Sequence, residues 1–174
     1  MYAELRNNNQ GLIKLITGAL NANSEASEIK CVLDTPVSAK IDGGQNIGMV
    51  VVSNAVDIAI EKAKISGIAV VGCSNYASAT GALGVWARKI AQEGLVGIVM
   101  SQTYEMVAPH GSFEPIFGTN PFSIGIPTKP RPQVLDMATS AAAWYGLKTA
   151  EKEGLPIADD IAYDRHGMPT TDPG

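Results

Sequence analysis

The stretch GIAVVGCSNYASATGALGVWARKIAQEGLVGIVMSQ, residues 67–102, decides the fold class of this chain. Residues 67–74 are an apolar run between glycines, typical of a central strand that is buried on both faces. Residues 94–102 repeat that pattern and predict a second buried strand. Between them, residues 82–93 place apolar side chains on one face and charged side chains on the other, as an amphipathic helix does. This strand–helix–strand order predicts parallel pairing of the two strands through a right-handed crossover.

Further elements extend the alternation in both directions. They are a helix over 2–16 weakened by asparagines and a glycine, strands over 28–35 and 37–43, a helix over 47–66, strands over 121–127 and 132–138, and a helix over 139–154. Thr139 or Ser140 is the expected N-cap of the last helix, and Gly154 is its expected C-terminal stop. We therefore predict one domain over residues 1–174, of the α/β class, with a mixed sheet and flanking helices.

The composition restricts the class of partner. Hydrophobic residues make up 45% of the 174 residues, charged residues make up 17%, and the formal net charge is −4. A lightly charged surface suggests that a partner covers part of it, whereas the lack of a basic cluster argues against nucleic acid. The apolar stretches are too short and interrupted to span a bilayer, which argues against a membrane partner. Cys31 and Cys73 show no metal-binding spacing and are interpreted as buried, reduced thiols of a cytoplasmic protein.

Several glycine-rich or hydroxyl-rich turns could approach a phosphate. The segments at 42–48 and 81–84 contain glycines before helices, but their spacing is not that of a Rossmann fingerprint. The segment DMATS, residues 136–140, places two hydroxyl residues where a strand gives way to a helix, which suits either an anion or a plain helix cap. GTNP (118–121) predicts a tight turn, and TTDP (170–173) predicts a turn with a buried or semi-buried carboxylate.

These segments together resemble those of one enzyme family, the malate/L-lactate dehydrogenase family that is unrelated to the Rossmann dehydrogenases. The matching stretches, in family order and spacing, are GIAVVG (67–72), GLVGIVMSQ (94–102), APHGSFEPIFGTNP (108–121), LDMATS (135–140) and DRHGMPTTDP (164–173). The resemblance implies a non-Rossmann fold that binds NAD or NADP, and a homodimer when the protein is full length. It also implies hydride transfer between the nicotinamide and a small 2-oxo acid, 2-hydroxy acid or imine substrate.

The resemblance also suggests which residues bind the cofactor. Thr103 and the segment Asp136, Met137 and Ala138 match positions that contact the cofactor in relatives. The following hydroxyl residues, Thr139 and Ser140, and the turn residues Gly118, Thr119 and Asn120 complete the predicted cofactor-binding set. No metal ligand is predicted.

The sequence departs from the family in its catalytic features. Relatives carry an SHGxxR-like motif just upstream of the stretch that resembles MYAELRNNN, and they continue beyond TTDP. We therefore expect the chain to be a central portion of a family member, truncated at both ends and close to inactive alone. Many relatives also carry a histidine in an HxGA-like pattern, where this chain has Ser78 or Ala79, depending on how the loop is matched.

Three residues remain as candidate catalytic groups. Tyr76 is the nearest titratable side chain to the replaced histidine, and Ser78 could at most relay a proton. His110 lies in a segment that is near the cofactor and substrate in the family, where a structural role competes with acid–base work. The other histidine, His166, is expected to be solvated.

Three functions are therefore open at the level of the sequence. The first is an NAD(P)-dependent oxidoreductase acting on a small 2-oxo or 2-hydroxy acid. The second is a non-catalytic, degenerate paralogue or fragment that binds nucleotide or a partner subunit. The third is an α/β binding module that shares only the fold. The sequence does not choose the substrate, or NADH over NADPH.

Overall fold

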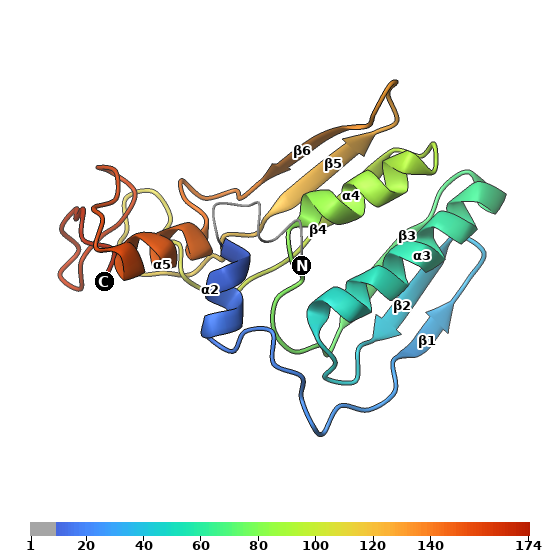
Figure 1. The fold of residues 1–174 in the computed structure, drawn as a ribbon, viewed down its shortest axis with the longest axis horizontal. Coiled ribbons are helices and arrows are strands. Elements are labelled where there is room, and N and C mark those ends of the chain that lie inside the picture. The colour runs from blue at the N-terminus through green and yellow to red at the C-terminus, as the bar shows by residue number, and fades with distance from the viewer. Residues whose placement is uncertain (1–9) are drawn as a thin grey trace.

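The computed structural model describes residues 10–174, and every structural statement below refers to these residues. Part of the predicted helix at 2–16 lies outside them, and the described part is α2, Gln10–Ile16. Six strands form two three-stranded sheets, and four described helices accompany them (Figure 1). The predicted α/β class, with mixed strand pairing and flanking helices, is confirmed.

The first sheet has the order β1-β2-β3, with bounds Lys30–Asp34, Ser38–Asp42 and Val70–Ser74. β1 and β2 pair antiparallel, whereas β2 and β3 pair parallel and are joined by the long helix α3, Gly48–Ser66. Ile41 on β2 is fully buried against Val51 and Ala55 of α3. Because β2 alternates its buried side chains, α3 covers one face of this sheet.

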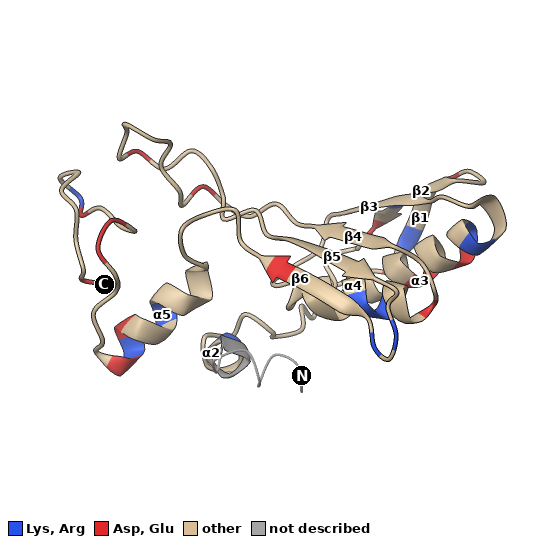
Figure 2. Cartoon of the chain, turned by 90° about the horizontal axis from the view of Figure 1, so that it is seen from above, with Lys and Arg blue, Asp and Glu red and all other residues tan. Residues whose placement is uncertain are grey.

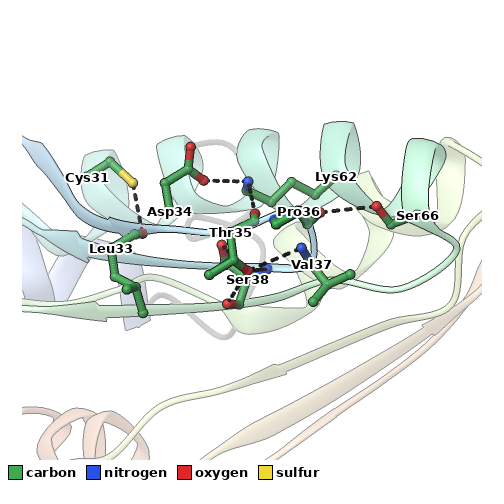
Figure 3. Close-up of polar contacts among 9 residues, drawn as sticks. All are labelled: Cys31, Leu33, Asp34, Thr35, Pro36, Val37, Ser38, Lys62 and Ser66. Atoms are coloured by element: carbon green, nitrogen blue, oxygen red, sulfur yellow. Dashed lines mark hydrogen bonds and ion pairs between the residues drawn. The ribbon is translucent and has the colours of Figure 1, made fainter.

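The β1–β2 turn is fastened to the end of α3 (Figure 3). Lys62 donates from Nζ to Oδ1 of Asp34 at 2.5 Å and to the backbone oxygen of Thr35 at 2.6 Å. The hydroxyl of Ser66 donates to the backbone oxygen of Pro36 at 3.1 Å. The predicted strand pair around Pro36 is therefore a hairpin held to the helix that covers it.

The second sheet has the order β4-β5-β6, with bounds Gly97–Met100, Phe122–Ile126 and Gln133–Met137, and both pairings are antiparallel. Helix α4, Leu83–Gln92, covers one face of it. Gly125 permits the close approach, because a Cβ at that position would lie 2.2 Å from the backbone oxygen of Ala87. The two sheets are joined through helices α3 and α4, which lie side by side (Figure 1). Val52, Val56 and Ile60 of α3 pack against Trp86 and Ile90 of α4.

The predicted parallel pairing of residues 67–74 with 94–102 is wrong. β3 and β4 lie at the edges of different sheets, β3 beside β2 and β4 beside β5. Neither strand is buried on both faces, because each sheet has a helix on one side only: Val70 is 68% exposed, Ile98 61% and Met100 74%. The open face of the second sheet also carries Leu135 and Met137, and Figure 2 shows the charged residues gathered mainly on helices and loops instead.

The last helix also differs from its prediction. Helix α5 runs from Trp144 to Glu153, begins after Ala143 with no side-chain cap, and ends at Gly154 in the left-handed conformation as predicted. Thr139 and Ser140 do not cap it. The hydroxyl of Thr139 donates to the backbone oxygen of Thr119 at 3.1 Å, and that of Ser140 donates to the backbone oxygen of Ala142 at 2.7 Å. α5 packs against α2 at one end of the molecule (Figure 1).

Two smaller predictions are also corrected. Cys31 is exposed on β1, at the edge of its sheet, whereas Cys73 on β3 is half-buried, and burial raises the pKa of the Cys73 thiol. Asp172 in the TTDP turn is exposed, and its Oδ1 accepts the backbone N–H of Gly174 at 3.0 Å. A hydrogen bond within an exposed turn, and not burial, therefore holds the Asp172 carboxylate in place.

Candidate functional site

A cavity of about 1130 Å³ lies beyond the carboxyl ends of β4 and β6, between the start of α4 and the start of α5. It is bounded by the loop after β3, the segment after β4, the end of β6 and parts of α2 and α5. Small-molecule sites in proteins are usually concave cavities with a few polar groups, so this cavity is the candidate functional site. The predicted site residues that line it are Tyr76, Ser78, Thr103, Thr119, Asp136, Met137 and Ala138.

The cavity loop, residues 75–81, forms one side of the site. Ser78 has a φ of 64°, in the left-handed region that a residue with a side chain seldom adopts. The loop is anchored to α4, because Nε1 of Trp86 donates to the backbone oxygen of Thr80 at 2.9 Å. Tyr76 and Ser78 of this loop are among the residues that line the cavity, and their contact with a substrate stays a prediction.

The same loop is hydrogen-bonded to the glycine-rich turn, residues 43–48, which leads into α3. The backbone N–H of Gln45 donates to the oxygen of Asn75, and that of Gly48 donates to the oxygen of Ala77, both at 2.8 Å. In the reverse direction, the N–H of Ala77 donates to the oxygen of Asn46 at 2.9 Å. The glycine-rich turn thus positions the cavity loop.

A group of hydroxyl residues forms another side of the cavity. Thr119 is buried, and its N–H donates to Oγ1 of Thr103 at 2.8 Å. The N–H of Thr103 donates in turn to Oδ1 of Asn120 at 3.1 Å. Gly118 allows this close packing, because a Cβ there would lie 2.3 Å from Oγ1 of Thr103. Thr139 joins the group through its bonds to the oxygen of Thr119, so these predicted residues form one cluster although only Thr103 and Thr119 line the cavity.

Asp136 has a role that the sequence did not predict. Its Oδ2 accepts the backbone N–H of Gly84 at 2.8 Å, in the first turn of α4. A carboxylate at a helix N-terminus satisfies a free donor and is favoured by the helix dipole. The argument that DMATS receives a phosphate at a helix start is therefore wrong, because α5 begins later and Asp136 itself occupies the α4 terminus.

The two histidines lie outside the residues that line the cavity. His110 is exposed in the turn after Pro109, and His166 is exposed as predicted, with its Nε2 accepting Nε of Arg165 at 3.1 Å. The predicted residues Gly118, Asn120, Thr139 and Ser140 are likewise not among the lining residues. Among the predicted catalytic groups, the structure therefore brings Tyr76 and Ser78 to the cavity, and His110 does not join them.

Two cationic side chains at the cavity were missed from the sequence. Lys14 of α2 is buried, with 5% of it exposed, and its Nζ lies 4.9 Å from the centre of the Tyr145 ring. Arg88 reaches the cavity from the exposed face of α4. The charged pattern of α4 indicated only a solvated face, and no local pattern links Lys14 to Tyr145 at the other end of the chain. Their position depends on the tertiary packing of α2 on α5 and of α4 on its sheet.

Two carboxyl groups among the described residues have lowered pKa values, and neither lines the cavity: Asp42 ends β2, and Asp164 begins a turn. The backbone N–H of Gly44 and the amide of Asn75 lower the pKa of Asp42. The backbone N–H groups of Met168 and His166 lower the pKa of Asp164. Within residues 10–174, no group of three or more His, Cys, Asp and Glu residues is arranged to hold a metal ion. None of the helices in that range is long and apolar enough to cross a membrane.

Comparison with known proteins defines the family. The family model for malate/L-lactate dehydrogenase matches residues 12–174, so the chain belongs to this family of dehydrogenases. It is 37% identical over 157 residues to the malate dehydrogenase of Pyrococcus horikoshii, covering 90% of this chain and 42% of that protein. It is 36% identical over 140 residues to the ureidoglycolate dehydrogenase (NAD(+)) of Escherichia coli, covering 79% of this chain and 40% of that protein.

Solved structures give the same result. The sulfolactate dehydrogenase of Methanocaldococcus jannaschii superposes with a TM-score of 0.74 at 34% identity, covering 94% of this chain and 46% of that one. The chain therefore spans less than half the length of the relatives that it matches. The family resemblance expected from GTNP, DMATS and TTDP is confirmed.

Proposed function

We propose that the chain forms the ligand cavity of an NAD(P)-dependent oxidoreductase that acts on a small 2-hydroxy or 2-oxo acid. The observation that carries this proposal is that the cavity is lined by residues of separate family-like segments, at the end of β4, before β5 and at the end of β6, together with the loop after β3. Relatives named for malate, sulfolactate and ureidoglycolate support the substrate class. The name of one relative includes NAD(+), which supports the cofactor class.

The residues present fit a dinucleotide together with a small acid. A cavity of about 1130 Å³ exceeds the roughly 300–1,000 Å³ of common small-molecule sites. Lys14 and Arg88 offer cations for an anionic ligand, while Thr103 and Thr119 offer hydroxyl groups beside the backbone. When bound, the nicotinamide would supply or accept the hydride.

The chain's own contribution would be to bind, orient and exclude water. Tyr76 and Ser78 line the cavity and are the proposed contacts to the substrate, the hydroxyl of Ser78 adding one hydrogen bond of about 1 kcal/mol. In a full-length protein we propose a homodimer. The exposed face of β4, β5 and β6 is apolar surface that a further part of the protein or a partner would cover.

A second candidate is a non-catalytic nucleotide-binding protein. The observation that favours it is the position of His110 and His166 in exposed turns away from the lining residues, which leaves Tyr76 as the titratable group of the cavity loop. Turnover separates the candidates. Oxidation of L-malate, sulfolactate or ureidoglycolate with NAD or NADP supports the first, and NADH binding without turnover supports the second.

A cavity-filling pair of variants tests whether this cavity is the cofactor site. Ala138 lines the cavity, whereas Ala141 is exposed and is not among the lining residues. Ala138→Phe should weaken NADH binding by about tenfold or more, because the added ring would enter the space that NADH is proposed to fill. Such overpacking costs about 1–3 kcal/mol. Ala141→Phe should leave the calorimetric Kd within about twofold of the original value. Equal Kd values for the two variants would remove the cavity from the proposal.

A further inference from the structure

Asp42, at the end of β2, accepts two hydrogen bonds on one oxygen. Its Oδ1 receives the backbone N–H of Gly44 at 2.8 Å and Nδ2 of Asn75 at 2.6 Å. Asn75 follows β3, so the second bond joins the ends of two neighbouring parallel strands. Both bonds are donated to an ionised carboxylate, so they are charge-assisted and they lower the pKa of Asp42.

Asn75 carries the connection onward. Its side-chain oxygen accepts Nε2 of Gln45 at 2.5 Å, while its backbone oxygen accepts the N–H of Gln45 at 2.8 Å. Asn75 and Gln45 both have left-handed backbones, with φ of 54° and 62°. Because such backbones cost energy, these hydrogen bonds keep both residues in a conformation that they would otherwise leave.

Gly43 and Gly48 pack closely against Tyr76, with no room between them for a side chain. A Cβ on Gly43 would lie 2.9 Å from Cβ of Tyr76, and one on Gly48 would lie 3.0 Å from its Cδ2. A shift of the turn would therefore move Tyr76, which lines the cavity together with Ser78 three residues beyond Asn75. The connection runs from Asp42 through Asn75 to the cavity loop.

We infer that Asp42 and Asn75 form a positioning pair that fixes the cavity loop, and with it Tyr76 and Ser78, at the ligand cavity. Neither residue is among those that line the cavity, so the pair acts through the loop and not by contact with a ligand. The part of this inference that concerns ligands rests on the proposed function. The part that concerns the loop rests only on hydrogen bonds within the chain.

A donor–acceptor swap tests the pair. Asn75→Asp keeps the size of the side chain and its tolerance of a left-handed backbone, but it places a second carboxylate against Asp42. Hydrogen exchange in the cavity loop should rise by about tenfold, as expected when one hydrogen bond is replaced by repulsion. Asp42→Asn alone should stay within about threefold of the original exchange rate, because its amide oxygen can still accept both donors. The double variant Asp42→Asn with Asn75→Asp removes the repulsion between the two carboxylates and should recover part of the lost protection, because Gly44 and residue 75 share one oxygen of Asp42 and an amide cannot accept from one and donate to the other through the same atom.

Asp34→Asn is the matched control, since Asp34 is a carboxylate in the same sheet that is bonded to Lys62 instead of the loop. It should leave exchange in the cavity loop unchanged and should not rescue Asn75→Asp. If Asn75→Asp does not fold, folding of the double variant supports the pair, and failure of both overturns it. Unchanged exchange in Asn75→Asp, or a double variant no better than Asn75→Asp, also overturns it.

NADH titration of the same variants gives the second readout. Asn75→Asp should raise the Kd by about fivefold or more, and the double variant should recover part of that loss. An unchanged Kd alongside faster exchange would overturn the link between the pair and the ligand. If the original chain binds no NADH, the proposed function fails, and the exchange comparison still decides whether the pair holds the loop.

Discussion

Replacing Gly125 with alanine should separate α4 from the sheet that it covers. A Cβ at this position would lie 2.2 Å from the backbone oxygen of Ala87, 2.6 Å from its carbonyl carbon and 3.2 Å from Cβ of Ala91. Two of these atoms belong to the helix backbone, so no rotamer change relieves the contact. Overpacking of this kind costs about 1–3 kcal/mol. The strain falls on the helix whose first turn borders the cavity.

Gly72 on β3 is the matched control. It is also a strand glycine, yet a Cβ there would meet nothing within 4 Å. Gly72→Ala should be neutral or stabilising by about 0.5–1 kcal/mol, because alanine restricts the unfolded chain. The two variants should therefore differ by about 1–4 kcal/mol, or about 2–16 °C in Tm for a chain of this length.

The assay is urea and thermal unfolding followed by far-ultraviolet circular dichroism. Both variants are compared with the original chain, and coincidence of the circular dichroism transition with the tryptophan fluorescence transition supports the two-state treatment. If Gly125→Ala were as stable as Gly72→Ala, α4 would not lie on β5 as described, and the position of the cavity beside the α4 N-terminus would also be refuted.

Three further predictions concern the cavity loop and its support. Ser78→Val should be about 1–2 kcal/mol less stable than Ser78→Gly in urea, because a β-branched residue resists the left-handed φ of 64°; equal stabilities would contradict this backbone. Trp86→Phe should lose about 1 kcal/mol with its bond to Thr80, and an unchanged urea midpoint would argue against that anchor. Because the folded-state pKa of Asp42 is lowered, its stabilising contribution is present above its ordinary pKa of 3.8 and is lost as pH falls through the lowered value. Tm measured between about pH 6 and pH 2 should fall more steeply for the original chain than for Asp42→Asn, and parallel curves would count against the carboxylate's role.

Much of the fold could be predicted from local patterns. The long helix α3 begins next to the glycines expected to open it, and Gly154 ends α5 as expected. Whether an apolar strand is covered on both faces is not a local property, which is why β3 and β4 were misplaced. The start of α5 was misplaced because the N–H and the hydroxyl of Thr139 both donate to the oxygen of Thr119, twenty residues away, which holds Thr139 beside the segment before β5 and not in a helix.

The candidate site residues came from family-like segments and from the loop where the chain departs from them. Tyr76, Ser78, Asp136, Met137 and Ala138 line the cavity, and their role in binding stays a prediction. The bond from Gly84 to Asp136 spans 52 residues and appears in no local pattern, so the carboxylate was assigned to a cofactor and not to the end of α4. Lys14 was missed for the same reason, because its partner Tyr145 lies on the last helix.

β3 and β4 lie in different sheets with no ladder hydrogen bonds between them, so side-chain packing connects the two sheets of the described chain. This packing consists of the contacts of Val52, Val56 and Ile60 with Trp86 and Ile90. The cavity extends from the loop after β3 to the strand ends of the second sheet. A molecule that fills the cavity therefore contacts residues attached to both sheets. A substitution in the packing between α3 and α4 is expected to change the distance between the two sides of the cavity. Val56 does not line the cavity, yet a change in its packing is expected to change the shape of the cavity.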